Sequence, residues 1–271
     1  MGTDNSTPLF YHKKLDPEHA ECEQIMVSLI DAVDPKEDYH IGHPEVTLPP
    51  GTCCSDTQTT LTYRYGGTSL IDMDYASVTP EDFLRGFANI FRAIVEFSKI
   101  DFYHLDIKLS NILVDEYIHF RMIDFGISAS VEYPIQETIF LQRYELWPYE
   151  TILLTDCDNY FSDDLFKEYI TLPYFRSVFP KIKNSVNDIK LNLISLKQKY
   201  KDRRALRLAI YEKIDVYSLG ITLITIIQKL HVGALKKNLY SLALKMANFD
   251  TVKRLTAVQA YHEYMKIIHD I

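Results

Sequence analysis

Apolar residues recur every three or four positions in two stretches of the first hundred residues, and this spacing predicts amphipathic helices. One helix is expected over residues 17–33, after the capping carboxylate of Asp16 and before Pro35. A second, longer helix is expected over residues 80–100, where Thr79 begins a capping box. Most of the sequence in the second half of the chain also follows helical spacing, so helices are expected to dominate there.

Short runs rich in β-branched and aromatic residues lie on either side of the second predicted helix, and they predict strands. These runs occupy residues 45–48, 59–65, 112–114 and 119–123, and a glycine pair at residues 66–67 ends the second of them. A small β-containing front followed by a large helical back is an α+β layout.

The composition is that of a folded globular chain with an acidic balance. Its 271 residues are 47% hydrophobic, which is enough for a full core in one large domain or a two-lobed unit. A formal net charge of −8 argues against a protein whose task is to neutralise nucleic-acid phosphates. No nucleic-acid partner is therefore expected.

Nothing in the sequence predicts export or membrane insertion. The first ten residues, MGTDNSTPLF, lack a basic region followed by an apolar run, and the most apolar stretch, residues 216–227, is too short to span a bilayer. The four cysteines show no CxxC spacing, which favours reduced thiols in a cytoplasmic protein. They are Cys22, Cys53, Cys54 and Cys157.

Two polar motifs lie close together near the middle of the chain. Residues 104–111 read HLDIKLSN, and residues 124–126 read DFG after a predicted hairpin. Together they resemble the catalytic loop H-R-D-x-x-x-x-N and the metal-binding motif D-F-G of the protein kinases. The probability that so many fixed residue types match by chance at this separation is on the order of one in a million.

The resemblance implies a role for each polar residue of the two motifs. Phosphoryl transfer depends on positioning and charge neutralisation, so a carboxylate has to orient the substrate hydroxyl while Mg²⁺ bridges the ATP phosphates. Asp106 corresponds to that carboxylate, and Lys108 to a cation beside the transferred phosphate. Asn111 and Asp124 correspond to oxygen ligands of Mg²⁺.

Further segments are similar to the same family in the family's order. Residues 61–70, LTYRYGGTSL, resemble the strand and hinge beside which ATP binds, with Tyr65 at that site. Residues 148–150, PYE, stand where the family has A-P-E, and Arg254 is similar to the late arginine that pairs with that glutamate. The segment DVYSLG resembles the helix whose aspartate, here Asp215, braces the catalytic loop.

The first strand-like segment, FYHKKL at residues 10–15, resembles the V-A-I-K strand of the family. This resemblance places Lys13 as the lysine that binds the ATP phosphates, with Lys14 one register away. The expected partner from the following helix is Glu23, with Glu21 as the alternative. A pair of lysines is also a common solvated surface feature, so both interpretations stay open.

Two departures from the family pattern concern nucleotide binding and regulation. No G-x-G-x-x-G occurs, and only twelve residues precede Lys13, so we expect either an N-terminally shortened chain or ATP binding without a glycine-rich lid. Leu105 replaces the arginine that clamps a phosphorylated activation loop. The hydroxyls of that segment are therefore expected to be dispensable for activity, and they belong to Ser128, Ser130, Tyr133, Thr138 and Tyr144.

A third departure is a long insert, about residues 151–213, between Glu150 and Asp215. The insert carries a basic stretch that we expect to form one helical face, either solvated or available to an acidic partner. The residues of that face are Lys197, Lys199, Lys201, Arg203, Arg204 and Arg207.

The expected fold is α+β and protein-kinase-like, with a reduced N-lobe at residues 1–67 that lacks the Gly-rich loop and a mainly helical C-lobe at residues 68–271. The resemblance covers about residues 10–265, and the compact pattern with an insert is similar to kinases of large DNA viruses. It implies a protein kinase that uses ATP and Mg²⁺ on a protein substrate, with serine/threonine specificity favoured by Lys108. The alternatives are a pseudokinase that binds proteins and, disfavoured by the A-P-E pair, a small-molecule kinase.

Overall fold

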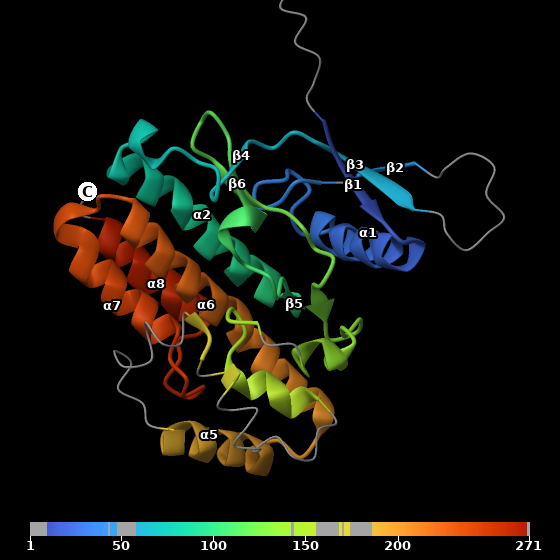
Figure 1. Cartoon of the computed structure of the whole chain (residues 1–271), viewed down its shortest axis with the longest axis vertical. Coiled ribbons are helices and arrows are strands. Elements are labelled where there is room, and N and C mark those ends of the chain that lie inside the picture. The colour runs from blue at the N-terminus through green and yellow to red at the C-terminus, as the bar shows by residue number, and fades with distance from the viewer. Residues whose placement is uncertain are drawn as a thin grey trace, which may run out of the picture.

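The computed structural model of the chain has a mixed α/β architecture with small antiparallel sheets (Figure 1). It describes most of the chain, and the account below is confined to that part. The described residues are 10–42, 44–47, 58–141, 144–155, 168–169, 171–173 and 186–269.

A three-stranded antiparallel sheet and one helix form the N-terminal part. The strands lie in the order β1 (Phe10–Leu15), β3 (Thr59–Arg64) and β2 (Glu45–Thr47). Helix α1 (Pro17–Asp31) contacts both β1 and β3. The Asp16 carboxylate caps α1 by accepting a hydrogen bond from the backbone N–H of His19, as the sequence predicts.

Two smaller sheets carry the segments that the sequence analysis singled out. Strands β4 (Thr68–Ser69), β6 (Ile112–Val114) and β7 (Phe120–Met122) form one, and β5 (Phe102–Tyr103) pairs with β8 (Ala129–Ser130) in the other. The motif HLDIKLSN therefore lies between β5 and β6, and DFG lies between β7 and β8. Because β6 pairs with β7, the two motifs are brought together at one end of this hairpin.

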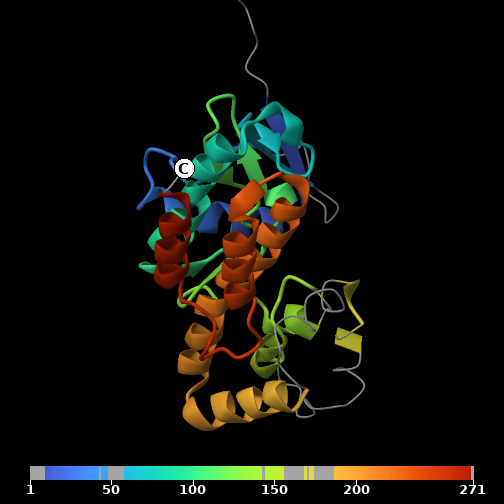
Figure 2. The ribbon, with the colours of Figure 1, turned by 90° about the vertical axis from the view of Figure 1, so that its left-hand side faces the viewer.

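Helices dominate the described C-terminal part. Helix α2 packs on α8, and α6 packs on α7, while α5 lies at the end of the molecule away from the N-terminal sheet (Figure 1, Figure 2). The helices are α2 (Pro80–Ser98), α5 (Val186–Lys199), α6 (Arg203–Lys229), α7 (Lys236–Met246) and α8 (Ala257–Ile268). Short 3₁₀ turns connect them and the strands: η1 (Tyr75–Ser77), η2 (Leu109–Asn111), η3 (Glu137–Leu141), η4 (Tyr149–Leu154) and η5 (Gly233–Leu235).

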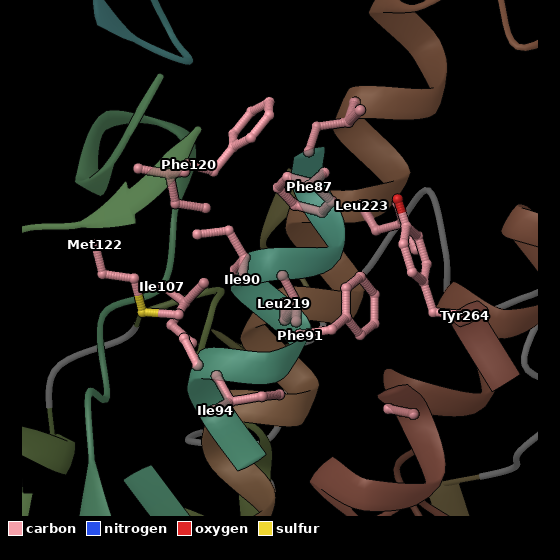
Figure 3. Close-up of a cluster of buried hydrophobic side chains, with 14 of the residues drawn as sticks. Phe87, Ile90, Phe91, Ile94, Ile107, Phe120, Met122, Leu219, Leu223 and Tyr264 are labelled. Atoms are coloured by element: carbon pink, nitrogen blue, oxygen red, sulfur yellow. The ribbon is translucent and has the colours of Figure 1, made fainter. Parts of the chain in front are cut away.

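The apolar face of α2 lies at the centre of the main core (Figure 3). Phe87 and Phe91 point from α2 toward α8, where the ring of Phe91 stacks on Tyr264 with ring centres 4.1 Å apart. The Tyr264 hydroxyl donates to the backbone oxygen of Leu84 at 2.8 Å, which satisfies its only polar atom inside the core. Phe120 of β7 packs on the other side of Phe87, so the hairpin that carries the motifs rests on this core.

The structure corrects two expectations about the insert. Helix α6 is continuous from Arg203 to Lys229, so the expected insert boundary near residue 213 lies inside a helix. The expectation of one basic helical face is wrong, because Lys197 and Lys199 lie in α5 whereas Arg203, Arg204 and Arg207 lie in α6. The break comes at Asp202, whose side chain caps α6 by accepting from the backbone N–H of Ala205 at 2.7 Å.

Two further expectations concern the whole chain. No helix in the described ranges is long and apolar enough to cross a membrane, and the apolar stretch at residues 216–227 is buried within α6. Cys22 carries a free, exposed thiol, and the other three cysteines lie outside the described residues.

Candidate active site

The loop at residues 104–111 is held by a buried carboxylate from α6. The backbone N–H groups of His104 and Leu105 each donate to Asp215 at 2.8 Å, so the predicted bracing of the loop by this aspartate is confirmed. Leu105 has a left-handed backbone (φ 63°), which is unfavourable for a branched side chain and has to be held by its surroundings. Trp147 contributes by donating its ring N–H to the Leu105 carbonyl at 2.6 Å.

The carboxylate of Asp106 is buried and accepts hydrogen bonds from three side chains. Lys108 Nζ and Asn111 Nδ2 donate to Oδ2 at 2.7 and 2.9 Å, and the Tyr144 hydroxyl donates to Oδ1 at 2.5 Å. These three donors fix the orientation of the carboxylate, and the ammonium of Lys108 places a positive charge beside it. The arrangement therefore presents Asp106 as a positioned hydrogen-bond acceptor.

Asp124 and the N-terminal lysine form an ion pair across the site. Lys13 Nζ lies 2.7 Å from Asp124 Oδ1 and 2.6 Å from Glu23 Oε2. The predicted pairing of Lys13 with Glu23 is confirmed, whereas the alternatives Lys14 and Glu21 are exposed. Burial by itself would raise the pKa of Asp124, but the Lys13 ammonium holds that pKa below its usual value.

In the same ion pair, the pKa of the lysine shifts in the opposite direction. Burial by itself would lower the pKa of Lys13, but the carboxylates of Asp124 and Glu23 raise that pKa above its usual value. Both members of the pair are therefore charged over the whole neutral range of pH. Lys13 is the cation that an anionic ligand entering the site would meet.

Tyr63 was missed in the sequence analysis. Its hydroxyl, on β3, donates to Glu23 Oε1 at 2.5 Å, so Glu23 is held by Tyr63 through one oxygen and by Lys13 through the other. The alternation of residues along the strand could have indicated that Tyr63 faces inward. Tyr63 lies two positions after the buried Leu61 and therefore on the same face of β3.

The candidate cofactor residues line a cavity of about 410 Å³. Such a volume lies within the usual range for small-molecule sites. Lys13, Glu23, Asn111 and Asp124 line the cavity, as does the predicted Tyr65. Tyr65 is exposed at the rim, and the hydrogen-bond partner of its hydroxyl is Thr68 Oγ1 at 3.4 Å.

The two predicted Mg²⁺ ligands fit a small, hard cation. Asn111 donates through Nδ2 to the Asp106 carboxylate and backbone oxygen. Its side-chain oxygen accepts from Ser110 Oγ at 3.3 Å and keeps a second lone pair for a cation. Asp124 adds a carboxylate on the wall of the same cavity. Mg²⁺ is commonly bound through one or two protein oxygens together with ligand phosphates and water. No group of three or more His, Cys, Asp or Glu side chains suited to a metal occurs among the described residues.

A buried histidine supports the DFG segment from the N-terminal side. His40 Nδ1 lies 2.8 Å from Asp34 Oδ2, and Nε2 lies 2.6 Å from Asp31 Oδ1. The His40 ring makes an edge contact with Phe125, with ring centres 6.1 Å apart. The end of α1 is thus tied to the residue that follows Asp124. Sequence spacing gave no signal for this contact, since it depends on how the chain folds back.

Two hydroxyls of the segment between DFG and PYE contact the loop, and a third forms a hydrogen bond within the segment. Ser128 Oγ donates to the His104 carbonyl at 3.1 Å, Ser130 Oγ accepts from the backbone N–H of Tyr133, and Tyr144 donates to Asp106. The expectation that these hydroxyls are dispensable for activity stays a prediction for all five. The hydroxyls of Ser128, Ser130 and Tyr144 have the hydrogen-bond partners just described, whereas Thr138 and Tyr133 are exposed residues.

Two arginines of α6 form ion pairs with the same segment. Arg203 and Arg207 both form ion pairs with Glu137 in η3, and Arg207 Nε lies 2.7 Å from Glu137 Oε1. Arg203 also donates to the Leu154 carbonyl at 2.7 Å. The basic stretch that was expected to be solvated or to bind a partner is, at these two positions, engaged within the chain.

The lysine of the cavity gives a test of these electrostatics. In Lys13→Met, burial still acts on Asp124 while the largest opposing charge is gone and only the weaker effects of His104 and Lys108 remain, so the pKa of this carboxyl is expected to rise. In the wild type, Asp124 stabilises the fold at pH values above the pKa that this carboxyl has in the unfolded chain. This stabilisation is lost as the pH falls through the lower pKa of Asp124 in the folded protein. The loss of stability in Lys13→Met should therefore grow as pH rises from about 3 to 7.

The measurement is urea unfolding of both proteins at a series of pH values. Lys14→Met is the matched control, because Lys14 lies next in the strand but is exposed. Its pH dependence should follow that of the wild type. A stability difference between wild type and Lys13→Met that stays constant over this pH range would contradict the assigned role of the ion pair.

Comparison of the sequence with protein-family models and with curated proteins finds no match in either case. Any function assigned to this chain therefore rests on the geometry of the site.

Proposed function

We propose that this chain is an ATP-dependent protein kinase with the two-lobed, protein-kinase-like fold that its motifs imply. One observation carries the proposal: a single cavity is lined by Lys13, Asn111 and Asp124, and Asn111 is hydrogen-bonded to Asp106. A cation for phosphates, two oxygen ligands for Mg²⁺ and a positioned carboxylate for a hydroxyl thus come from segments far apart in the chain. This set matches what phosphoryl transfer requires.

In this proposal each residue has a separate task. Lys13, oriented by Glu23 and Tyr63, binds the phosphates of ATP. Asn111 and Asp124 would hold Mg²⁺, which neutralises phosphate charge when bound. Asp106 orients the acceptor hydroxyl and takes up its proton.

Lys108 has two tasks in the same scheme. It lies 2.7 Å from Asp106 Oδ2, so it helps to hold that carboxylate in place, and its ammonium offsets the charge that develops on the transferred group. By resemblance it also favours serine or threonine as the acceptor.

A protein substrate is supported by a second cavity beside Asp106. This cavity, of about 560 Å³, is lined by Lys108 and Tyr144 on the side of the loop and by Ile221 and Thr222 of α6. It offers space for a polypeptide next to the proposed base. The buried pair of Glu150 and Arg254 also follows the protein-kinase pattern rather than that of small-molecule kinases, and its contact is 2.5 Å.

The alternative function is a pseudokinase that acts as a protein-binding module. The observation that favours it is the ammonium of Lys13, which lies 2.7 Å from the carboxylate assigned to Mg²⁺. If this pair never opens, Asp124 Oδ1 is closed to a metal and the Lys13 ammonium keeps a single donor for a phosphate.

Calorimetric titration with ATP, with and without Mg²⁺, tests the proposal directly. A kinase should bind ATP more tightly with Mg²⁺, and Lys13→Met should weaken that binding because a cation facing the phosphates is lost. Lys14→Met is the matched control and should bind like the wild type. Absence of ATP binding under both conditions would contradict the kinase proposal.

Thr138→Ala is expected to leave phosphate transfer unchanged. Thr138 is exposed in η3, and Leu105 offers no cation to a phosphate on this segment. The rate of ³²P transfer from ATP to casein, measured beside the wild type, checks this prediction. A large loss of activity in a folded Thr138→Ala protein would show that this hydroxyl has a regulatory role.

A further inference from the structure

An exposed aromatic ring lies on the wall of the proposed ATP cavity, beside Lys13. Tyr11 is two positions before Lys13 on β1, so both side chains project from the same face of the strand. Both residues line the cavity. Lys13 is engaged with two carboxylates, whereas Tyr11 is 58% exposed. A large, flat and mostly apolar ring is therefore accessible to a ligand inside the proposed nucleotide site.

The pairing of β1 with β3 shows toward which end of the cavity Tyr11 lies. Lys13 is opposite Leu61. Tyr11 is opposite Tyr63, which is two residues nearer to the end of β3. This end of β3 leads directly into the segment at residues 65–67, which lines the same cavity. Tyr11 therefore lies on the side of Lys13 that is nearer to this segment.

A second apolar side chain lines the same end of the cavity. Leu113 of β6 is one of the lining residues, and a methyl group added to Gly66 would lie 3.1 Å from its Cδ1 atom. Leu113 therefore lies against the segment toward which Tyr11 is displaced. Because β1 and β6 belong to different sheets, Tyr11 and Leu113 reach the cavity from separate parts of the fold. A flat ring that entered this end would meet both.

The polarity of the cavity thus changes along its length. Lys13, Asn111 and Asp124 provide the charged and polar end, which the proposed function assigns to phosphates and Mg²⁺. A nucleoside triphosphate has its phosphates at one end and a flat base at the other. With the phosphates at Lys13, the base is directed toward the end that carries Tyr11 and Leu113.

We propose that Tyr11 binds the base of the nucleotide by stacking its ring on the face of the base. This inference rests on the proposed kinase function, and it gives a role to a residue that the sequence motifs leave unassigned. Stacking of a base on an aromatic side chain requires an accessible ring face and no charge. Tyr11 should therefore contribute to the binding of ATP but not to the binding of inorganic tripolyphosphate, which has the phosphates without a base.

Calorimetric titration of the purified chain with ATP and with inorganic tripolyphosphate, both with Mg²⁺, tests the inference. Tyr11→Ala should weaken ATP binding by about tenfold or more, as is usual when a ring that stacks on a base is removed. Its affinity for tripolyphosphate should equal that of the wild type. Tyr11→Phe keeps the ring without the hydroxyl, so it should restore the affinity for ATP.

Two other variants serve for comparison. Phe10→Ala is the matched control, because Phe10 is also an exposed ring but projects from the opposite face of β1. It should bind both ligands like the wild type. Lys13→Met should weaken both ligands, because Lys13 faces the phosphates that the two ligands share. Thermal unfolding of each variant serves to exclude misfolding as the cause of a loss.

Tyr11→Trp gives a direct spectroscopic signature of the stack. The natural tryptophan, Trp147, is buried, whereas an indole at position 11 would be exposed like the ring that it replaces. ATP should quench the fluorescence of the new indole, because the base lies on its face. Tripolyphosphate should leave that fluorescence unchanged.

Three results would overturn the inference, and they separate it from the proposed function. Unchanged ATP affinity in Tyr11→Ala, together with a loss in Lys13→Met, would reject the stack but keep the ATP site. Equal losses of ATP and tripolyphosphate affinity in Tyr11→Ala would show that Tyr11 acts on the phosphate end through Lys13. No binding of ATP by the wild type with Mg²⁺ would reject the kinase function and this inference with it.

Discussion

Asp106→Asn is expected to lower phosphate transfer by about two to four orders of magnitude, which is the usual contribution of a positioned acid or base. The affinity for ATP should stay nearly unchanged, because Asp106 contacts the acceptor hydroxyl and not the nucleotide. The amide keeps the shape of the side chain and can still accept from Lys108 or Asn111, so the loop should stay folded. Turnover on casein and calorimetric titration with Mg²⁺ and ATP measure the two effects separately.

Asp124→Asn is the matched variant and should behave differently. Its carboxylate lines the cavity proposed for the nucleotide and is assigned to Mg²⁺ in that proposal, so both turnover and Mg²⁺-dependent ATP affinity should fall. Equal losses of ATP affinity in the two variants would contradict the separation of chemistry from metal binding. Thermal unfolding of both proteins serves to exclude misfolding as the cause.

Arg254→Ala is expected to cost about 3–5 kcal/mol of folding stability, as is usual when one partner of a buried ion pair is removed. Arg254 and Glu150 are both almost completely buried, with 1% exposure each, and their contact is 2.5 Å. Arg254 also donates to the Asn248 carbonyl at 2.7 Å. Removing it leaves the Glu150 carboxylate buried without its counter-charge, and urea unfolding measures the loss.

Two further variants identify the cause of that loss. Lys253→Ala, at the neighbouring exposed position, should leave the unfolding transition where it is, because its pair with Asp250 lies at the surface. The double variant Glu150→Leu with Arg254→Met removes both charges and should be more stable than Arg254→Ala. A double variant no more stable than Arg254→Ala would show that packing, and not the unpaired charge, causes the loss.

The parts of the fold that could be predicted from the sequence depend on local signals. The helices that begin after Asp16 and Thr79 were predicted because their caps and apolar spacing lie within a few residues of each other. The strands of the motif hairpin followed from composition in the same way. The break before α6 was missed, although a local signal marks it, because Asp202 precedes the helix as a capping residue.

The site was predictable where a motif fixed the residues and unpredictable where contacts are distant in sequence. Asp106, Asn111 and Asp124 were named from the resemblance of their two motifs to those of the protein kinases. The choice of Lys13 over Lys14 rested on the resemblance alone, because segment 10–15 shows no clear alternation of apolar and polar residues.

The contacts made by tyrosine hydroxyls were beyond the sequence for a related reason. Tyr63 reaches Glu23, and Tyr144 reaches Asp106, across separations of 40 and 38 residues. Nothing in the local pattern around either tyrosine indicates which carboxylate it meets, because the partner is set by the packing of separate segments.

Transfer of the γ-phosphate is the measurement that tests the central claim most directly. The purified wild type and Asp106→Asn would be incubated with Mg²⁺, γ-³²P-ATP and casein, and label would be followed on casein and on the chain itself. The account predicts label on casein with the wild type and almost none with Asp106→Asn. No label from a folded wild type that binds ATP with Mg²⁺ would contradict the account and favour the pseudokinase.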